Sequence, residues 1–142
     1  MRKQYHFRPS ARGTLAWDVD RLVALARELP RTPVPLAAIR ELDEPYWFGP
    51  GDVPTCRAVA GHARLIAATD ERYPIILSAD GRVMDGMHRV CRALLAGQEV
   101  IEAVQFVQDP PPDHVGANAD ELPYDETESA PPETPLFDSR PR

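Results

Sequence analysis

The chain has few cysteines and no long apolar run, and each shortage excludes a class of protein. Its 142 residues include only Cys56 and Cys91, too few and too far apart for a CxxC redox pair or a zinc knuckle. No stretch approaches the ~20 apolar residues that a membrane-spanning helix needs. Residues 1–6 have no apolar run behind them and do not predict a signal peptide. We therefore expect a cytoplasmic protein whose cysteines pack as small apolar side chains on helices.

Basic residues are not in excess either, since the formal net charge is -6. The charge is uneven: from Asp109 onward nine acidic residues accompany two basic ones, whereas residues 1–108 are nearly balanced. The segment from Asp109 also holds eight of the sixteen prolines. Such a segment cannot bury enough apolar surface to offset the entropy lost on ordering it. The sequence thus predicts one domain at 1–115 and an acidic, proline-rich, disordered tail at 116–142.

The spacing of apolar residues predicts three helices and several strands. The helices are expected from near Asp18 to Pro30, at 54–69 and at 87–95. The extended segments are expected at 32–36, 73–78, 82–85 and 100–107, with an Asp-Gly hairpin turn between the second and the third. Alternation of helices and strands over one short chain predicts an α/β (α+β) fold in a single domain.

The same spacing predicts which side chains are buried. On the second helix the apolar stripe consists of Cys56, Val59, Ala60, Ala63, Ile66 and Ala67. On the third it consists of Met87, Val90, Cys91, Leu94 and Leu95. His62, His88 and Arg89 lie off these stripes. We expect the side chains of His88 and Arg89 to be available to a ligand.

The segment 85–89, Asp-Gly-Met-His-Arg, lies where a predicted strand gives way to the third helix. Gly86 can adopt backbone conformations that other residues avoid, and it can direct the N–H groups of the helix N-terminus toward an anion. His88 and Arg89 follow on the first turn of the helix. This combination predicts an anion-binding pocket.

Two further groups of residues have two interpretations each. His62, His88 and Asp85 carry donor atoms that suit divalent ions, but the alternative is a hydrogen-bonded histidine beside a phosphate. Trp17 and the cluster 46–48 have rings that can stack on a base or fill one end of a small core. We expect the hydrogen-bonded histidine and the core role.

The motif and its surroundings resemble the ParB/sulfiredoxin superfamily, in its D-G-x-H-R branch. That family has an apolar strand, a hairpin, a strand ending in D-G-x-H-R or G-E-R-R, a helix ending in glycine, and a closing strand. The resemblance covers residues 33–108, from Pro-Ile-Ile-Leu at 74–77 through 85–89 to Gly97 and Ile-Glu-Ala-Val at 101–104. It implies a small mixed sheet packed with helices.

The resemblance also implies a bound nucleotide, which is ATP, ADP or CTP, with Mg²⁺. In the family, the Gly-x-His-Arg turn lies against the nucleotide phosphates. Gly86 would then let the backbone approach the phosphates, and the N–H groups of Met87 and His88 would donate to them. The side chain of His88 would add a binding or catalytic donor, and Arg89 would pair with a phosphate oxygen. Asp85 would hold Mg²⁺ or act as a base.

Departures from the family narrow these expectations. Sulfiredoxins carry a cysteine where this chain has Met87, so repair of sulfinic acid is not expected. Partition-type ParB proteins continue into a helix-turn-helix domain, which this chain lacks, so we do not expect sequence-specific DNA binding. A third branch phosphorylates free serine with the help of an upstream acid. Glu41 is the first candidate for that acid, ahead of Asp43 and Glu44, and the alternative is a solvated acidic turn.

Two functions follow from these observations. The first is a nucleotide-dependent phosphotransferase or nucleotide hydrolase, with Asp85, His88 and Glu41 as catalytic groups. The second is a non-catalytic module that binds a nucleotide or another anion and contacts a protein partner. The tail offers two segments that can dock, at 122–124 and 136–137, and it can serve solubility, a partner, or competition with phosphate for the basic pocket.

Overall fold

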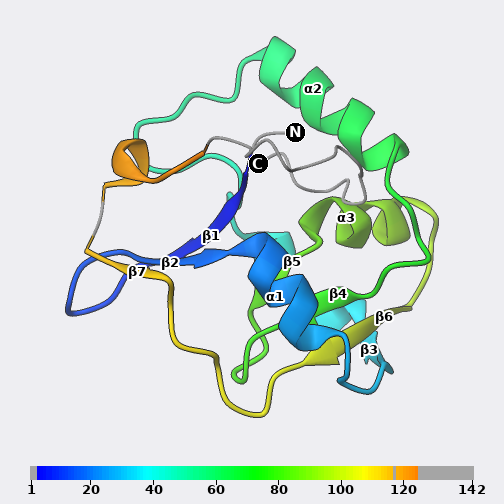
Figure 1. Cartoon of the computed structure of the whole chain (residues 1–142). Helices are drawn as coiled ribbons and strands as arrows, with labels where there is room; N and C mark the ends of the chain where they lie inside the picture. The colour runs from blue at the N-terminus through cyan, green and yellow to red at the C-terminus, as the bar shows by residue number, and fades with distance from the viewer. Residues whose placement is uncertain (1–2, 117, 125–142) are drawn as a thin grey trace.

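The chain forms two β-sheets, and the larger one carries the predicted motif (Figure 1). The computed structural model describes residues 3–116 and 118–124. The strands are β1 (Tyr5–Arg8), β2 (Leu15–Asp18), β3 (Thr32–Pro35), β4 (Ile75–Leu77), β5 (Val83–Asp85), β6 (Val100–Gln105) and β7 (His114–Val115). The α-helices are α1 (Val19–Ala26), α2 (Cys56–Ala67) and α3 (Met87–Leu95), and the 3-10 helices are η1 (Leu36–Ala38), η2 (Arg40–Asp43) and η3 (Ala119–Glu121). The predicted α/β (α+β) fold is confirmed.

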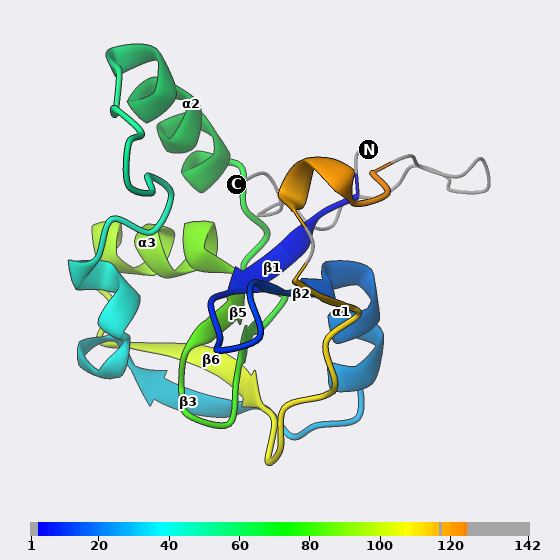
Figure 2. The same ribbon diagram turned by 90° about the vertical axis from the view of Figure 1, so that its left-hand side faces the viewer.

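The larger sheet is mixed and has the strand order β3-β6-β4-β5. Strand β6 runs parallel to β4 and antiparallel to β3, and β4 runs antiparallel to β5. Helices α1 and α3 lie on opposite faces of this sheet (Figure 2). All three residues of β4 are therefore buried, as its uninterrupted apolar sequence predicts.

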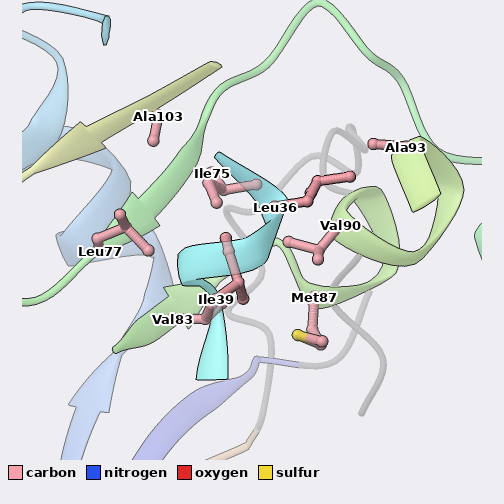
Figure 3. Close-up of a cluster of buried hydrophobic side chains, with 9 residues drawn as sticks. All are labelled: Leu36, Ile39, Ile75, Leu77, Val83, Met87, Val90, Ala93 and Ala103. Carbon is pink, nitrogen blue, oxygen red and sulfur yellow. The ribbon is translucent and has the colours of Figure 1, made fainter. Parts of the chain in front are cut away.

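Each face of the larger sheet has its own apolar core. Figure 3 shows the core on the α3 face, which consists of Leu36, Ile39, Ile75, Leu77, Val83, Met87, Val90, Ala93 and Ala103. The core on the α1 face consists of Trp17, Leu22, Ala26, Ile76, Met84, Val104 and Phe106. The core role expected for Trp17 is confirmed, and its indole N–H donates to the carbonyl of Pro110 at 2.8 Å. Helix α1 starts where it was predicted to start, and Asp18 caps it by accepting from the N–H of Asp20.

A β-bulge sets the direction in which Asp85 points. Ile76 pairs with Asp85 and Leu77 pairs with Val83, so β5 has one residue more than β4 over this stretch. The extra residue, Met84, packs in the core on the α1 face. In a regular strand Asp85 would share the face of Val83. The bulge instead turns Asp85 to the face of Ile76, toward α1.

Helix α2 differs most from its prediction. It stands away from both sheets and packs on α3 (Figures 1 and 2). None of its residues is buried, and Cys56, Val59 and Ala63, which were expected to face the core, are exposed. The half-buried side instead contains His62 and Leu65. Of the predicted stripe only Ile66 is half-buried, so the predicted face was wrong for its other members: the side of α2 that contacts the body of the protein is rotated toward His62 and Leu65.

Helix α3 is buried at its beginning and exposed at its end. His88 and Arg89 are buried, whereas Leu95 is 78% exposed, so the predicted separation of apolar and polar sides was wrong for these residues. Met87, Val90 and Ala93 pack in the core on the α3 face of the sheet, whereas Leu94 and Leu95 at the end of the helix are exposed. Cys91 is half-buried, and burial raises the pKa of its thiol above the ordinary value. That thiol stays protonated at neutral pH.

The smaller sheet, β1-β2-β7, was not predicted. Strand β1 lies within residues 1–13, for which no strand was expected, and it pairs with β2, which follows them. Leu122, assigned to the tail by the sequence, is buried with Tyr5 and Ala16, and Tyr124 packs beside them. The packed part of the chain therefore extends to Tyr124. The rest of the predicted tail, 125–142, lies outside the described residues. No helix in 3–116 or 118–124 is long and apolar enough to span a membrane.

Candidate functional site

The turn between β5 and α3 requires glycine. Gly86 has φ +109°, in the left-handed region, and precedes the first residue of α3. A Cβ at this position would lie 2.7 Å from Cγ2 of Ile75 and 2.8 Å from Nη2 of Arg89. Both backbone conformation and space thus exclude a side chain. The side chains of Ile75 and Arg89, which lie over this glycine, hold the turn in its conformation.

Asp85 and Arg89 form a buried ion pair across this turn. Nη2 of Arg89 lies 3.1 Å from Oδ2 of Asp85, and both side chains are 4% exposed. The same nitrogen donates to the carbonyl oxygen of Pro74 at 3.4 Å. An unpaired charge is costly to bury, so each of the two groups needs the other. Arg89 is therefore a buried and partnered residue, and not the freely accessible one that its place off the apolar stripe predicted.

The ion pair lines a pocket between α1 and the larger sheet. The pocket has a volume of about 390 Å³, which falls in the size range of small-molecule sites. Its apolar walls consist of Val23, Ala26, Leu29, Pro74, Ile76 and Val104. Its polar lining consists of Arg27, Arg31, Tyr73, Asp85 and Arg89. An apolar cavity with a few convergent polar groups is typical of a ligand site.

Positive charge predominates in the polar lining, with three guanidinium groups against one carboxylate. The side chain of Arg27 is exposed and makes no hydrogen bond or ion pair with any residue that the structure describes. Arg31 pairs with the exposed Glu102 at 3.2 Å and donates to the carbonyl of Arg72 at 3.0 Å. Guanidinium groups placed in this way suit a phosphate or carboxylate ligand.

His62 of α2 and His88 of α3 form a separate group beneath Trp47. Nδ1 of His62 lies 2.9 Å from Nε2 of His88. The ring of Trp47 stacks on both imidazoles, with centroids 4.2 Å from His62 and 4.4 Å from His88. The ring of Phe48 meets His62 edge-on at 5.7 Å. The expected hydrogen-bonded histidine has the other histidine as its partner, and the phosphate expected beside it stays a prediction.

The geometry of this pair is that of a hydrogen bond between two rings. The centroids are 5.1 Å apart and the ring planes differ by 18°, so the rings lie end to end with their nitrogens facing. One of those nitrogens must lack a proton in order to accept. Burial lowers the pKa of His62 below its ordinary value, which favours the neutral ring. The lowered pKa therefore favours a pair in which the His62 ring is neutral.

The three acids upstream of the motif lie elsewhere. Glu41 is buried, and its Oε2 accepts from the N–H of Val83 at 2.8 Å, at the outer edge of β5. Glu44 pairs with Arg82 at 2.8 Å, and Asp43 is exposed. None of the three lines the pocket between α1 and the sheet. The role of Glu41 as a catalytic base stays a prediction.

Comparisons with family models, with curated proteins and with solved structures find no match to this chain. The resemblance to the ParB/sulfiredoxin superfamily and the nucleotide that it implies therefore stay predictions. In the described ranges, no group of three or more His, Cys, Asp or Glu side chains is placed to hold a metal ion. Asp85 as a ligand of Mg²⁺ likewise stays a prediction.

Of the predicted site residues, the structure brings Asp85 and Arg89 to the pocket. Gly86 shapes the turn between them, and donation from the N–H groups of Met87 and His88 to a phosphate stays a prediction. The side chain of Met87 belongs to the core on the α3 face, and His88 belongs to the histidine pair. The residues of the predicted motif therefore do not form one site: they contribute to a pocket, to a core and to the contact between α2 and α3.

Three residues of the pocket, Arg27, Arg31 and Tyr73, were not predicted as site residues, and the two arginines come from segments far from the motif. The spacing of Val23 and Arg27 does indicate that the two lie on one face of the first helix, because residues four positions apart are neighbours there. Nothing in the sequence indicates that this face meets the residues of β5. That contact depends on the side of the sheet to which α1 packs.

Proposed function

We propose that this protein binds a nucleotide, or another small molecule with phosphate groups, in the pocket between α1 and the larger sheet. The observation that supports this most is that three guanidinium groups, those of Arg27, Arg31 and Arg89, line one pocket with mainly apolar walls. Guanidinium groups present paired N–H donors that match phosphate oxygens. The apolar walls and the partly exposed ring of Tyr73 offer a surface for a base.

Binding without phosphoryl transfer fits the positions of the acids best. Oδ2 of Asp85 accepts from Nη2 of Arg89 at 3.1 Å, so this oxygen is already occupied. Glu41 accepts from the backbone of β5 and does not line the pocket. A general base must lie within hydrogen-bond reach of the group that it deprotonates. The non-catalytic binding module is therefore the hypothesis that we retain.

The proposal places the protein in the cytoplasm. Both cysteines are free thiols, and free thiols are typical of a reducing compartment. Cys56 is exposed on α2, where an oxidising compartment would leave it open to reaction. A protein partner belongs to the same proposal, because a module without catalysis acts through the molecules that it contacts.

A thermal-shift screen tests the proposal. The full chain is measured with ATP, ADP, CTP and GTP, each with and without Mg²⁺, because a ligand of the folded state raises its melting temperature. Arg27→Ala is the diagnostic variant, since Arg27 lines the pocket and its side chain supports nothing else in the described fold. Arg57→Ala is the matched control, an exposed arginine on α2.

We expect at least one nucleotide to raise the melting temperature of the wild type and of Arg57→Ala, and to do so less for Arg27→Ala. The absence of a shift with all four nucleotides, joined to an absence of heat in titration calorimetry, would overturn the proposal. Equal shifts in all three proteins would place the ligand elsewhere.

A further inference from the structure

We propose that the acidic tail of this chain occupies the pocket between α1 and the larger sheet, with Leu136 and Phe137 against its apolar walls. This inference rests on the proposed function, because it names a competitor for the same site and so a regulation of ligand binding. It is supported by the place where the tail begins, by its charge and by its two large apolar residues.

The tail begins beside the first residues of α1. Tyr5 donates its hydroxyl to the carbonyl of Pro123 at 2.6 Å, and its ring meets that of Tyr124 edge-on at 5.3 Å. The backbone N–H of Lys3 donates to the carbonyl of Tyr124, and the ammonium of Lys3 pairs with Asp18, the cap of α1, at 3.1 Å. Residues 125–142 therefore start from a fixed point at the N-terminal end of that helix.

The pocket is within easy reach of that point. Val23, Ala26 and Arg27, which line it, belong to the second half of α1 or directly follow it. A helix of eight residues is ~12 Å long, whereas the chain from Tyr124 to Leu136 can span ~40 Å. A short tether keeps the effective concentration of the tail at the pocket high.

Charge favours this occupant. Residues 125–142 contain five acidic and two basic side chains, and Glu133 and Asp138 flank the Leu-Phe pair. The pocket has three guanidinium groups and one carboxylate. Arg27 makes no ion pair with any residue in the described ranges, so it is available to a carboxylate of the tail.

The apolar content of the tail fits the pocket as well. Leu136 and Phe137 are the only large apolar residues in 125–142. A pocket of about 390 Å³ with mainly apolar walls has room for both side chains, and their burial is favourable. The preceding part of the same acidic segment already docks in this manner, because Leu122 is buried against Tyr5 and Ala16.

The consequence is competition. Carboxylates of the tail would engage the same guanidinium groups that a phosphate needs, so the tail and the ligand exclude each other. A ligand then binds only the fraction of molecules in which the tail has left the pocket. The exposed face of α2, with Arg57 and Arg64, is the other basic surface that the tail could cover.

Nuclear magnetic resonance of the ¹⁵N-labelled full chain, without ligand, tests the docking directly. Amide shifts are compared between the wild type, Leu136→Ala/Phe137→Ala and a control, Ser139→Ala. We expect the double variant to shift the resonances of Val23, Ala26 and Val104, and the control to leave them in place. We also expect the apparent Kd for ADP to fall at least about threefold in the double variant, as the competitor is weakened.

Shifts confined to α2, or no shift at the pocket, would overturn the tail proposal, whether or not ADP binds. Pocket shifts in a protein that binds no nucleotide, with or without the two substitutions, would support the docking and overturn the proposed function. The two failures are therefore distinguishable.

Discussion

The carboxylate of Asp85 and the guanidinium of Arg89 lie 3.1 Å apart, buried across the turn that joins β5 to α3. Two local features make this pair possible. A bulge in β5 turns Asp85 toward α1, and the left-handed conformation of Gly86 lets the helix start at once, so that Arg89 returns to the same side. The pair then lines the pocket with Arg27 and Arg31. The same two side chains therefore stabilise the fold and line the proposed binding pocket.

Arg89→Ala should therefore unfold the protein more readily, and not only weaken ligand binding. Removal of the guanidinium leaves the carboxylate of Asp85 buried without its partner, which costs about 3–5 kcal/mol in comparable buried pairs. Urea denaturation followed by circular dichroism measures the loss. Arg57→Ala, an exposed arginine, should stay within about 0.5 kcal/mol of the wild type. A loss below about 1 kcal/mol for Arg89→Ala would show that the pair is not needed for folding.

Gly86→Ala should destabilise the fold, because it adds a Cβ 2.7 Å from Ile75 to a backbone at φ +109°. Strain and overpacking together cost about 2–4 kcal/mol. Gly61→Ala is the matched control, since nothing lies within 4 Å of its Cβ position in the middle of α2. That change should stabilise the protein by about 0.5–1 kcal/mol through helix propensity. Equal effects of the two substitutions would contradict the geometry of the turn.

The sequence predicted the parts of the fold that follow local rules. The cap at Asp18, the buried strand β4 and the glycine at the start of α3 each have a chemical signal within a few residues. The strands β1 and β2 have no such signal, since they are four residues long and mix charged with aromatic side chains. Their pairing depends on contacts with the rest of the chain, including Leu122.

Glu41→Ala should destabilise the edge of β5. The substitution removes the acceptor of the buried N–H of Val83, and an unsatisfied buried donor costs about 1–3 kcal/mol. Asp43→Ala, two residues away and exposed, is the control and should have little effect. Both are measured by thermal unfolding of the full chain. A neutral outcome for Glu41→Ala would mean that Glu41 does not secure β5, and would return it to the candidates for a catalytic base.

The histidine pair predicts a dependence of stability on pH. Burial lowers the pKa of His62 in the folded protein below the ordinary value of 6.5. As the pH falls below 6.5, the unfolded chain takes up the proton first, so the contribution of His62 to stability is present above that pH and decreases below it.

Comparison with His62→Phe isolates this contribution. Phenylalanine keeps a ring beneath Trp47 but does not titrate. The free energy of unfolding is measured in urea near neutral pH and about one unit below the ordinary pKa of histidine. We expect the wild type to lose more stability than His62→Phe on acidification. An equal loss in both proteins would contradict a pKa lowered by folding.

The motif part of the candidate site could be predicted from the sequence, but the pocket that it lines could not. A motif of adjacent residues, such as 85–89, can be recognised because its chemistry is local. The pocket joins that motif to Arg27 and Arg31, which precede it by more than fifty residues, through the packing of α1 on one face of the sheet. The bulge that aims Asp85 at this face has no signature in the sequence. Side-chain direction therefore had to come from the structure.

Titration calorimetry of the full chain with ADP tests the central claim most directly, with wild type, Arg27→Ala, Arg57→Ala and Leu136→Ala/Phe137→Ala measured side by side. We predict that the wild type and Arg57→Ala bind ADP with equal affinity, and that the double tail variant binds more tightly. Loss of one charge-assisted hydrogen bond, about 1.5 kcal/mol, should weaken binding to Arg27→Ala about tenfold. The absence of binding to both the wild type and the double variant, or equal affinity of Arg27→Ala and Arg57→Ala, would contradict a phosphate-binding pocket between α1 and the larger sheet.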